Sequence, residues 1–509
     1  MIVVLPHKVK EKGVKIPYQF LEKIKLNQTL KAPSDAMAER ADALLIWLPE
    51  SAGSVHLGGL PNSELLQKRW RQRQPGPVQT ELPNKAGSAV RLAACQAAST
   101  FEYLNLARQQ VCALLTRRTR RLLIDVSLLP DEQKSRVAEA CLSSALAHVC
   151  PLPSLKSEPD KAYSLSQVQL TGLNEKLDLE ALRAEAQGNH LTRWLAALPG
   201  NSLAPKQYRA LLSPIAKAEG WQVEFITEAA LKKLGAGAFL AVTRGSPHRD
   251  AGILQLRYRP KDSRGKSPLA LIGKGICFDT GGVNLKSARY MHGMHEDMTG
   301  SAVALGALLA LTRQHYPRPV DCWLALAENH IGPDAYKPND VVTAANGKTI
   351  EVIHTDAEGR MVLADTLFIA GKKRPAMMID YATLTGACVY SLSSRYSGVF
   401  SNREALHSTL MAVGQGCGER VWPFPMDGDY DEALKSPVAD IKQCTLDSEA
   451  DHILAARFLQ NFVPEATDWV HIDLAAHHHK GGLGHISTDI TGFGVRFTLA
   501  LLRHQDICF

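Results

Sequence analysis

The chain has 509 residues, of which 45% are hydrophobic and 21% are charged, and it contains 37 glycines and 27 prolines. This composition is typical of a globular protein and excludes a disordered, collagen-like or coiled-coil chain. The longest apolar stretch runs from Ser301 to Thr312, well short of the ~18 residues that a membrane helix needs, so we expect no membrane contact.

The first residues, Met1–Leu5, form a short apolar run that is followed by lysines and a proline, which predicts a first strand and not an export signal. Ten cysteines are scattered along the chain without a C-x-x-C pair, and we expect them to be reduced and mostly buried. Both features favour a cytoplasmic protein.

The net charge of +7 lies almost entirely in the first third of the chain. Residues 1–180 carry 24 Lys and Arg against 18 Asp and Glu, whereas residues 181–509 carry 34 against 33. Basic clusters stand at 68–73 (KRWRQR) and 117–121 (RRTRR). Such clusters can bind nucleic acid, but a solvated face or a subunit contact also accounts for them, and no nucleic-acid-binding motif accompanies them.

Residues 1–150 alternate apolar runs with helical patterns, which predicts a small α/β layer. Strands are expected at Ala43–Leu48 and Leu122–Val126, and helices at Leu92–Leu115 and Gln133–His148. Residues 151–190 lose this regularity, and their prolines and serines predict a connecting segment that leads into a helix around Leu177–Gln187. We therefore expect a boundary near residue 180, between domains at 1–180 and 181–509.

The second part predicts a larger α/β domain with a mixed, mostly parallel sheet covered by helices. Asn346-Gly347 predicts a β-hairpin with a type I′ turn between Val341–Ala345 and Lys348–Ile353. The expected strands of the sheet are Phe239–Thr243, Ile253–Tyr258, Leu269–Ile272, Cys322–Ala327 and Met377–Asp380.

Two segments of this domain carry polar residues where α/β folds build their sites. Leu271–Gly282 (LIGKGICFDTGG) is an apolar strand that ends in a glycine-rich loop with Lys274 and Asp279. Glu296 and Asp297 stand at the start of an apolar helix, where they can simply complement the helix dipole. Neither segment alone identifies a function.

A third segment, Ile353–Leu367, places Asp356, Glu358 and Arg360 at alternate positions. In an extended backbone these three side chains point to one side, before a helix that begins near Glu358. Two carboxylates on one face repel each other unless a cation or proton compensates them, so the pattern favours a divalent metal such as Mg²⁺, Mn²⁺ or Zn²⁺.

These segments, taken together, carry a resemblance to a known family. Residues 354–361 read HTDAEGRM, close to the family signature Asn-Thr-Asp-Ala-Glu-Gly-Arg-Leu. The other matching segments are LPGN at 198–201, GAFLAV at 237–242, GKGICFDTGG at 273–282, ATLTGA at 382–387 and ITGFGVR at 490–496. The chain thus resembles the leucyl aminopeptidase family, the dinuclear metallo-exopeptidases, and its N-terminal third is by resemblance the family's smaller, variable α/β domain.

The resemblance implies two divalent ions, Zn²⁺ or Mn²⁺. It assigns the tighter ion to Lys274, Asp279, Asp297 and Glu358, and the more exchangeable ion to Asp279, Asp356 and Glu358. Two such ions balance the charge of the four carboxylates. Lys274 ligates only as the neutral amine, a form that neighbouring cations favour.

The implied reaction is removal of an N-terminal residue from a peptide by a water that two metals activate. Lys286 is implied to stabilise the tetrahedral oxyanion, and Arg360 to hold a bicarbonate ion that moves the proton as general base. The residues implied to contact the peptide substrate are Met294, Thr383, Leu384 and Gly386.

The sequence departs from the family pattern at three places. His354 replaces an asparagine, and its ring could reposition the Asp356 loop or keep a similar hydrogen bond through one nitrogen. Thr299 replaces a glycine beside the tighter metal. Ala475–Lys480 (AAHHHK) replaces an apolar pocket segment, which predicts a more polar pocket than one built for leucine; a separate metal site on the three histidines is the less favoured alternative.

Two other functions stay open from the sequence. One is a DNA-binding or scaffold protein of the same family that uses the basic N-terminal domain. The other is a dipeptidase of narrow specificity. The resemblance also implies a homohexamer, built from two trimers around an internal cavity.

Overall fold

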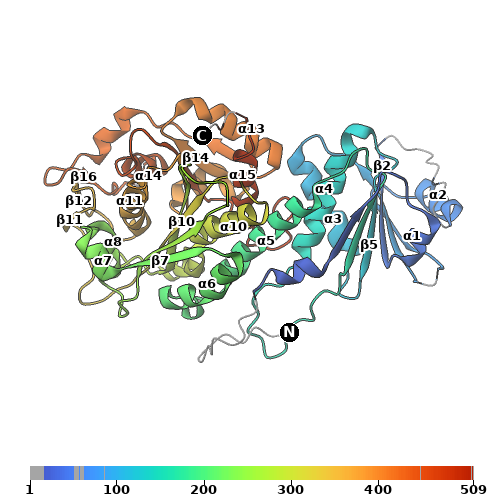
Figure 1. Cartoon of the computed structure of the whole chain (residues 1–509), viewed down its shortest axis with the longest axis horizontal. Coiled ribbons are helices and arrows are strands. Elements are labelled where there is room, and N and C mark those ends of the chain that lie inside the picture. Colours follow the sequence, from blue (N-terminus) through green and yellow to red (C-terminus); the bar gives the residue numbers. More distant parts are fainter. Residues whose placement is uncertain are drawn as a thin grey trace.

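The computed structural model describes residues 16–50, 57, 62–84, 86–447, 449–505 and 507. Figure 1 shows two sheets, each with its own helices, and helix α5 (Leu179–Ala196) between them. This mixed α/β architecture confirms the predicted fold class. The strand predicted at Met1–Leu5 lies outside the described residues. None of the described helices is long and apolar enough to cross a membrane.

The first sheet has six strands in the order β1-β6-β5-β2-β4-β3, and only β3 is antiparallel to its neighbour. Apolar side chains of α3 and α4 cover one face, and those of α1 and α2 cover part of the other. The strands are β1 (Lys25–Gln28), β2 (Ala43–Pro49), β3 (Val78–Glu81), β4 (Ala89–Cys95), β5 (Arg121–Asp125) and β6 (Gln167–Thr171). The helices are α1 (Asp35–Arg40), α2 (Ser63–Arg71), α3 (Thr100–Leu114) and α4 (Asp131–His148).

Two predictions for this region were wrong in part. The helix expected at Leu92–Leu115 begins only at Thr100, because Ser99 and Glu102 form a capping box that fixes its start, and the residues before it belong to β4. The segment 151–190 is not only a connection, since it contains β6, which lies between β1 and β5 in the sheet.

The second sheet has eight strands in the order β15-β14-β17-β13-β9-β10-β8-β7. Its four central strands, β17, β13, β9 and β10, are mutually parallel, as expected for a sheet covered on both faces. The strands are β7 (Gln222–Thr227), β8 (Gly252–Tyr258), β9 (Leu269–Asp279), β10 (Val320–Asn329), β13 (Met377–Ala382), β14 (Ser397–Ser401), β15 (Val421–Pro423) and β17 (Asp468–Asp473). A small third sheet holds β11 (Val341–Thr343), β12 (Thr349–Glu351) and β16 (Ile441–Lys442).

Helices cover both faces of the eight-stranded sheet. One face packs on α5, α6 (Pro205–Glu219), α10 (Thr299–Arg313), α13 (His407–Cys417) and α15 (Val495–Leu501). The other packs on α7 (Glu228–Lys233), α8 (Gly237–Thr243), α11 (Glu358–Gly371) and α14 (Asp451–Gln460). The remaining short helices are α9 (Ala288–Met291), α12 (Gly386–Leu392) and the 3₁₀ helices η1 (Gln19–Lys23), η2 (Gly200–Ser202), η3 (Met294–Glu296), η4 (Ser393–Arg395), η5 (Glu404–Leu406) and η6 (Gly428–Leu434).

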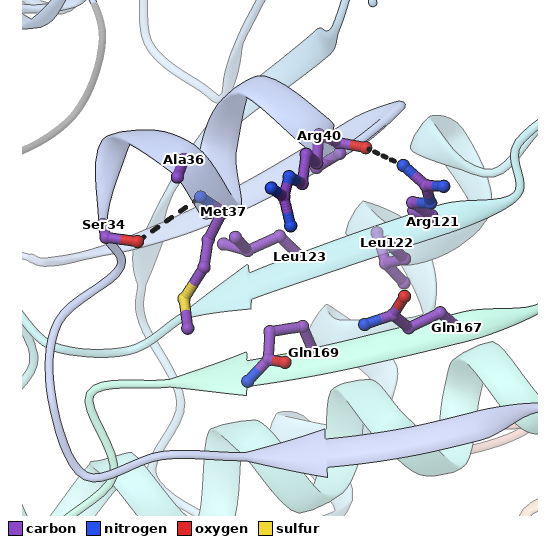
Figure 2. Close-up of a pocket in the computed structure, with 10 residues that line it drawn as sticks. Ser34, Ala36, Met37, Arg40, Arg121, Leu122, Leu123, Gln167 and Gln169 are labelled. Carbon is purple, nitrogen blue, oxygen red and sulfur yellow. Dashed lines mark hydrogen bonds between the residues drawn. The ribbon is translucent and has the colours of Figure 1, made fainter.

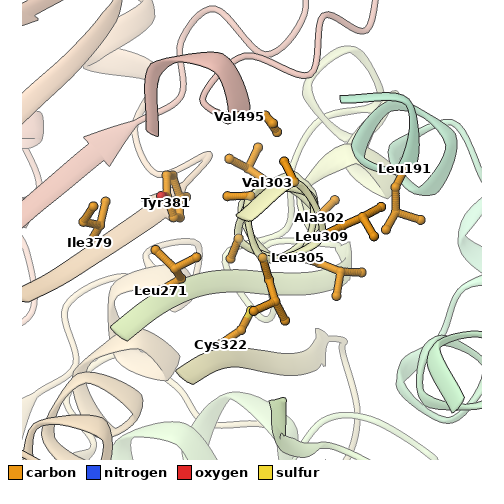
Figure 3. Close-up of a cluster of buried hydrophobic side chains, with 14 of the residues drawn as sticks. Leu191, Leu271, Ala302, Val303, Leu305, Leu309, Cys322, Ile379, Tyr381 and Val495 are labelled. Atoms are coloured by element: carbon orange, nitrogen blue, oxygen red, sulfur yellow. The ribbon is translucent and has the colours of Figure 1, made fainter. Parts of the chain in front are cut away.

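Helix α10 lies at the centre of the larger core. Figure 3 shows its apolar side chains surrounded by residues of β9, β10 and β13 on one side and of α5 on the other. The close approach of α5 needs two glycines, because a Cβ on Gly188 would lie 2.3 Å from the carbonyl oxygen of Gly306. This packing fixes the start of α10, where Asp297 stands.

Two further predictions in the second part need correction. Phe239–Thr243 is not a strand but the body of α8, whose Phe239 amide donates to the Asp365 carboxylate at 2.8 Å. The hairpin of β11 and β12 exists, but its loop has three residues, since Ala344 N donates to Lys348 O and Gly347 N to Ala344 O. Only Gly347 has positive φ there, at +88°, so the turn is not of type I′.

Helix α5 begins at the predicted domain boundary. It packs on α4 of the first part and on α10 of the second. The division into domains 1–180 and 181–509 therefore stays a prediction.

Asp365 provides a pH test of this fold. Its buried carboxylate holds α8 and the hairpin by accepting from Phe239 N at 2.8 Å and Ala345 N at 2.7 Å, and burial raises the pKa of Asp365 to about 6. Because the pKa of Asp365 is higher in the folded than in the unfolded state, its contribution to the free energy of unfolding is fully present below about pH 4. That contribution is lost as the pH rises through 6. We expect the unfolding free energy of the wild type, relative to Asp365→Asn, to fall by about 2 kcal/mol between pH 4 and pH 8.

Urea unfolding at four pH values measures this difference. The exposed Asp429→Asn serves as the control, and its difference from the wild type should not change with pH. A pH-independent difference for Asp365→Asn would contradict the assignment.

Candidate active site

The candidate site lies at the carboxyl ends of the parallel strands β9 and β13, where open α/β sheets place their ligands. Asp279 ends β9, and Asp297 stands just before α10. Asp356 and Glu358 stand at the start of α11. The structure thus brings together the carboxylates that the sequence singled out in three separate segments.

Lys274 joins two of these carboxylates inside the protein. Its side chain points from the middle of β9 toward α11, and its Nζ lies 2.8 Å from Asp297 Oδ1 and 3.0 Å from Glu358 Oε1. The same Nζ donates to the carbonyl oxygen of Thr383 at 2.9 Å. Gly359 leaves room for it, because a Cβ there would lie 2.7 Å from Nζ. Burial lowers the pKa of Lys274, but the surrounding carboxylates outweigh that effect and raise it above its usual value.

Lys286 joins the other two carboxylates. Its Nζ lies 2.9 Å from Asp279 Oδ2 and 2.5 Å from Asp356 Oδ1. Burial lowers the pKa of Lys286, and the carboxylates of Asp279, Glu358 and Asp356 raise it by more, so that this ammonium keeps its charge at neutral pH.

The cluster carries an excess of negative charge. Four carboxylates face two ammonium groups, and one oxygen from each of Asp279, Asp356 and Glu358 lies within 4.8 Å of the others. Burial, followed by repulsion from Glu358 and Asp279, raises the pKa of Asp356 to about 7. Burial also raises the pKa of Asp297 and Glu358. Such a group of carboxylates favours a bound cation.

Two carboxylate oxygens of the cluster are left without a partner. Asp297 Oδ2 and Glu358 Oε2 are buried and accept no hydrogen bond from the part of the chain that the structure describes. Buried charged oxygens are costly unless they are paired or ligate a metal. The oxygen-rich donor set with one amine suits hard and borderline divalent cations, so these residues fit the metal ions that the sequence predicts.

A network that the sequence did not reveal braces the loops of the site. Asn329 Nδ2, at the end of β10, donates to Asp279 Oδ1 at 2.8 Å and to the Thr355 carbonyl oxygen at 3.0 Å. The Tyr336 hydroxyl donates to the same carbonyl at 2.7 Å, and Thr355 Oγ1 donates to the Gly281 carbonyl oxygen at 2.6 Å. These contacts tie the glycine-rich loop after β9 to the segment before α11. Only the polar character of Asn329 at a strand end could have signalled them.

The charge of Arg360 interacts with that of Glu358, but its guanidinium is held by other residues. The prediction assumed an extended backbone, whereas the chain is helical from Glu358 onward. The Arg360 guanidinium lies 2.7 Å from Asp451 Oδ1 and donates to the Gln443 carbonyl oxygen at 3.0 Å. Its Nε is buried and has no acceptor among the described residues.

Hydrogen bonds to the Asp473 carboxylate hold the predicted substrate-binding segment after β13. Leu384 N donates to Asp473 Oδ1 at 3.1 Å, and Thr385 Oγ1 donates to Asp473 Oδ2 at 2.6 Å. Thr383 Oγ1 donates to Asp297 Oδ1 at 2.8 Å. Gly386 begins α12, and Met294 begins η3. Asp473 is a residue that the sequence analysis missed, because nothing local to β17 distinguishes its role.

The residues that depart from the family pattern form hydrogen bonds with different partners. Asp356 N donates to His354 Nδ1 at 3.2 Å, so the ring keeps a hydrogen bond through one nitrogen. Thr299 is buried and donates through Oγ1 to the Glu296 carbonyl oxygen at 2.5 Å. His478 Nδ1 lies 3.1 Å from Glu296 Oε2, whereas His479 Nδ1 lies 2.8 Å from Ser394 Oγ. The three adjacent rings therefore do not share one partner.

Comparisons with known proteins show which family this chain resembles. The family profile described as cytosol aminopeptidase family, catalytic domain, matches residues 190–499. A probable cytosol aminopeptidase of Chlorobaculum tepidum is 36% identical over 386 residues, which cover 74% of this chain and 76% of the relative. Another, of Wolbachia pipientis wMel, is 40% identical over 340 residues, which cover 65% of this chain and 66% of the relative. The structure of a tomato leucine aminopeptidase mutant superposes with a TM-score of 0.82 and 27% identity, covering 95% of this chain and 97% of that chain.

Replacement of one carboxylate tests the charge excess. Asp356→Asn relieves repulsion in the metal-free cluster, so we expect the Tm of the chelator-treated protein at pH 8 to rise by about 2 °C, which is roughly 1 kcal/mol. The same change removes a ligand, so added Mn²⁺ or Zn²⁺ should raise the Tm of the variant less than that of the wild type. The control, Asp429→Asn, should leave both values unchanged. A fall in the metal-free Tm of Asp356→Asn would contradict the charge argument.

Proposed function

The chain belongs to the cytosol aminopeptidase family, and from this premise we propose that it removes the N-terminal residue of peptides at a centre that holds two divalent metal ions. It is a hydrolase that acts on peptide bonds. The observation that carries the proposal is a group of four carboxylates, three of them buried, that faces only two lysines. Among the described residues, nothing pairs with Asp297 Oδ2 or Glu358 Oε2.

We assign the tighter ion to Lys274, Asp279, Asp297 and Glu358, and the more exchangeable ion to Asp279, Asp356 and Glu358. The short distances between these groups support the assignment, as does the charge balance that two divalent ions give to four carboxylates. Zn²⁺ and Mn²⁺ are the ions that we propose. When bound, such ions lower the pKa of a water and polarise the scissile carbonyl.

Lys286 supplies a fixed positive charge for the reaction. Its ammonium has three N–H groups, of which Asp279 and Asp356 engage two, and no further acceptor stands among the described residues, so we assign the third to a substrate oxygen. A preorganised cation beside a developing oxyanion lowers the barrier by several kcal/mol. We therefore assign to Lys286 the stabilisation of the tetrahedral oxyanion.

Arg360 is proposed to hold a bicarbonate ion, which moves a proton as general base. Asp451 and the Gln443 carbonyl fix the guanidinium from one side, and the unpartnered Nε is a donor for an anion. The anion would thus bind through Nε, which has no acceptor in the part of the chain that the structure describes.

The peptide is proposed to lie along the segment after β13, against the backbone of Thr383, Leu384 and Gly386. The hydrogen bonds of Asp473 to this segment and of Lys274 to Thr383 make it rigid. Met294 is proposed to contact the first side chain of the substrate. Because Glu296, two residues away, pairs with His478, we propose that this pocket is more polar than one built for leucine.

The first experiment measures hydrolysis of aminoacyl-anilides and dipeptides by metal-stripped protein that has been reloaded with Mn²⁺ or Zn²⁺. We expect metal-restored activity, and a loss of about a thousandfold in the double variant Asp356→Ala, Glu358→Ala. The matched control is Asp429→Ala, Glu465→Ala, two exposed carboxylates, which should retain activity. No turnover with any metal despite stoichiometric metal binding would contradict the proposal and direct attention to His354 and Thr299.

The same panel ranks the side chains of the substrate. N-terminal residues with polar side chains should be cleaved at least as well as leucine, and His478→Met should shift the ratio toward leucine by about tenfold. His479→Met is the control, since its ring pairs with Ser394. The panel also separates a broad aminopeptidase from a dipeptidase of narrow specificity.

We further propose a cytoplasmic location, which the names of the relatives support, and a homohexamer. Sedimentation equilibrium should then give six times the chain mass of 55.6 kDa. A mass near that of one chain would contradict the hexamer.

A further inference from the structure

The six-stranded sheet carries an open cavity of about 650 Å³ between α1, β5 and β6. Figure 2 shows the side chains of Met37 and Arg40 extending from α1 toward the sheet, and those of Gln167 and Gln169 standing on β6 in the same space. Helix α1 lies at the end of the molecule away from the eight-stranded sheet (Figure 1). The cavity is therefore separate from the candidate active site.

Two arginines and no carboxylate line the cavity. Arg40 and Arg121 line it, and Arg121 Nη1 donates to the Arg40 carbonyl oxygen at 3.3 Å. Neither guanidinium forms an ion pair with a carboxylate in the described ranges, and no Asp or Glu is among the lining residues. The nearby Asp42 already accepts the backbone amides of Arg120 and Arg121, both at 2.8 Å. Both guanidinium groups are thus available to an anion.

The remaining polar lining consists of amides. Gln167 and Gln169 are two residues apart on β6, so both side chains stand on the same face of the sheet. The register of β1 places Lys25 opposite Gln167 and Asn27 opposite Gln169, which extends this face with one more cation and one more amide. Met37 and Leu123 add apolar surface.

We propose that this cavity binds a small phosphorylated molecule of nucleotide size, with its phosphate at Arg40 and Arg121. Guanidinium groups recognise phosphate with paired, charge-assisted hydrogen bonds. The two glutamine amides offer donors and acceptors to the edge of a heterocycle, and Met37 offers apolar contact. The volume falls within the ~300–1,000 Å³ that is usual for small-molecule sites. In this proposal Arg121, the last residue of the basic run at 117–121, contacts the phosphate.

Calorimetric titration of the full chain at low salt tests the proposal, with AMP, GMP, CMP and UMP and with inorganic phosphate alone as probes. At least one nucleotide should bind more tightly than phosphate. Arg40→Ala and Arg121→Ala should each weaken both kinds of probe by about tenfold or more. Gln167→Leu should weaken the nucleotide but not phosphate.

Matched controls are Arg118→Ala and Arg69→Ala, because neither residue lines the cavity, and both should bind as the wild type does. Peptidase activity should be unchanged in every variant, so this test does not depend on the proposed catalytic function. Three results would overturn the proposal: no binding of any probe at millimolar concentration, binding that survives both cavity arginine substitutions, or binding of an oligonucleotide with steep salt dependence but of no mononucleotide. Circular dichroism confirms that each variant is folded.

Discussion

The mutual repulsion of four carboxylates, three of them buried and one half-buried, is the constraint on which the larger part of this protein depends. Asp279, Asp297, Asp356 and Glu358 come from different elements, and two lysines neutralise only half of their charge. A flexible framework would let these groups separate into solvent. Here the fully buried strand β9 and the helices that pack on it hold them together, so the folding energy of the sheet offsets the electrostatic cost.

The bracing of the site follows from the same constraint. The loop that follows Asp279 and the loop that carries Asp356 have no regular structure of their own, and hydrogen bonds from Asn329, Tyr336 and Thr355 tie them to each other. The pairing of β9 with β10 shifts register between Ala327 and Asn329, next to the pair of Asn329 with Asp279. Such irregularities near a site direct side chains where a regular ladder would not.

Much of the fold could be predicted from the sequence because it depends on local patterns, whereas the full set of candidate ligands was implied only by the family resemblance. The apolar run of β9 followed by glycines places Lys274 and Asp279 without reference to any other segment. The prediction of a strand at Phe239–Thr243 was wrong because a short apolar run suits a strand or a buried helix equally. The contact that decides between them is with Asp365, which is distant in the sequence. The alternation of Asp356, Glu358 and Arg360 suggested an extended backbone, whereas a helix begins at Glu358, and the partner of Arg360, Asp451, is distant in the sequence. Asp473 and Asn329 act through contacts with remote segments, which no local pattern encodes.

The strand order of the two sheets also determines when each can form during synthesis. All six strands of the first sheet lie between Lys25 and Thr171, so that sheet can close while the rest of the chain is still being made. In the eight-stranded sheet, β17 lies between β13 and β14, although it is the last strand to be synthesised. Until residues 468–473 emerge, β14 and β15 have no connection to the strands that carry the candidate ligands. Ribosome-bound chains that stop before β17 should therefore contain a complete six-stranded sheet and an incomplete eight-stranded sheet. In such chains the edges of β13 and β14 that pair with β17 are exposed to chaperones.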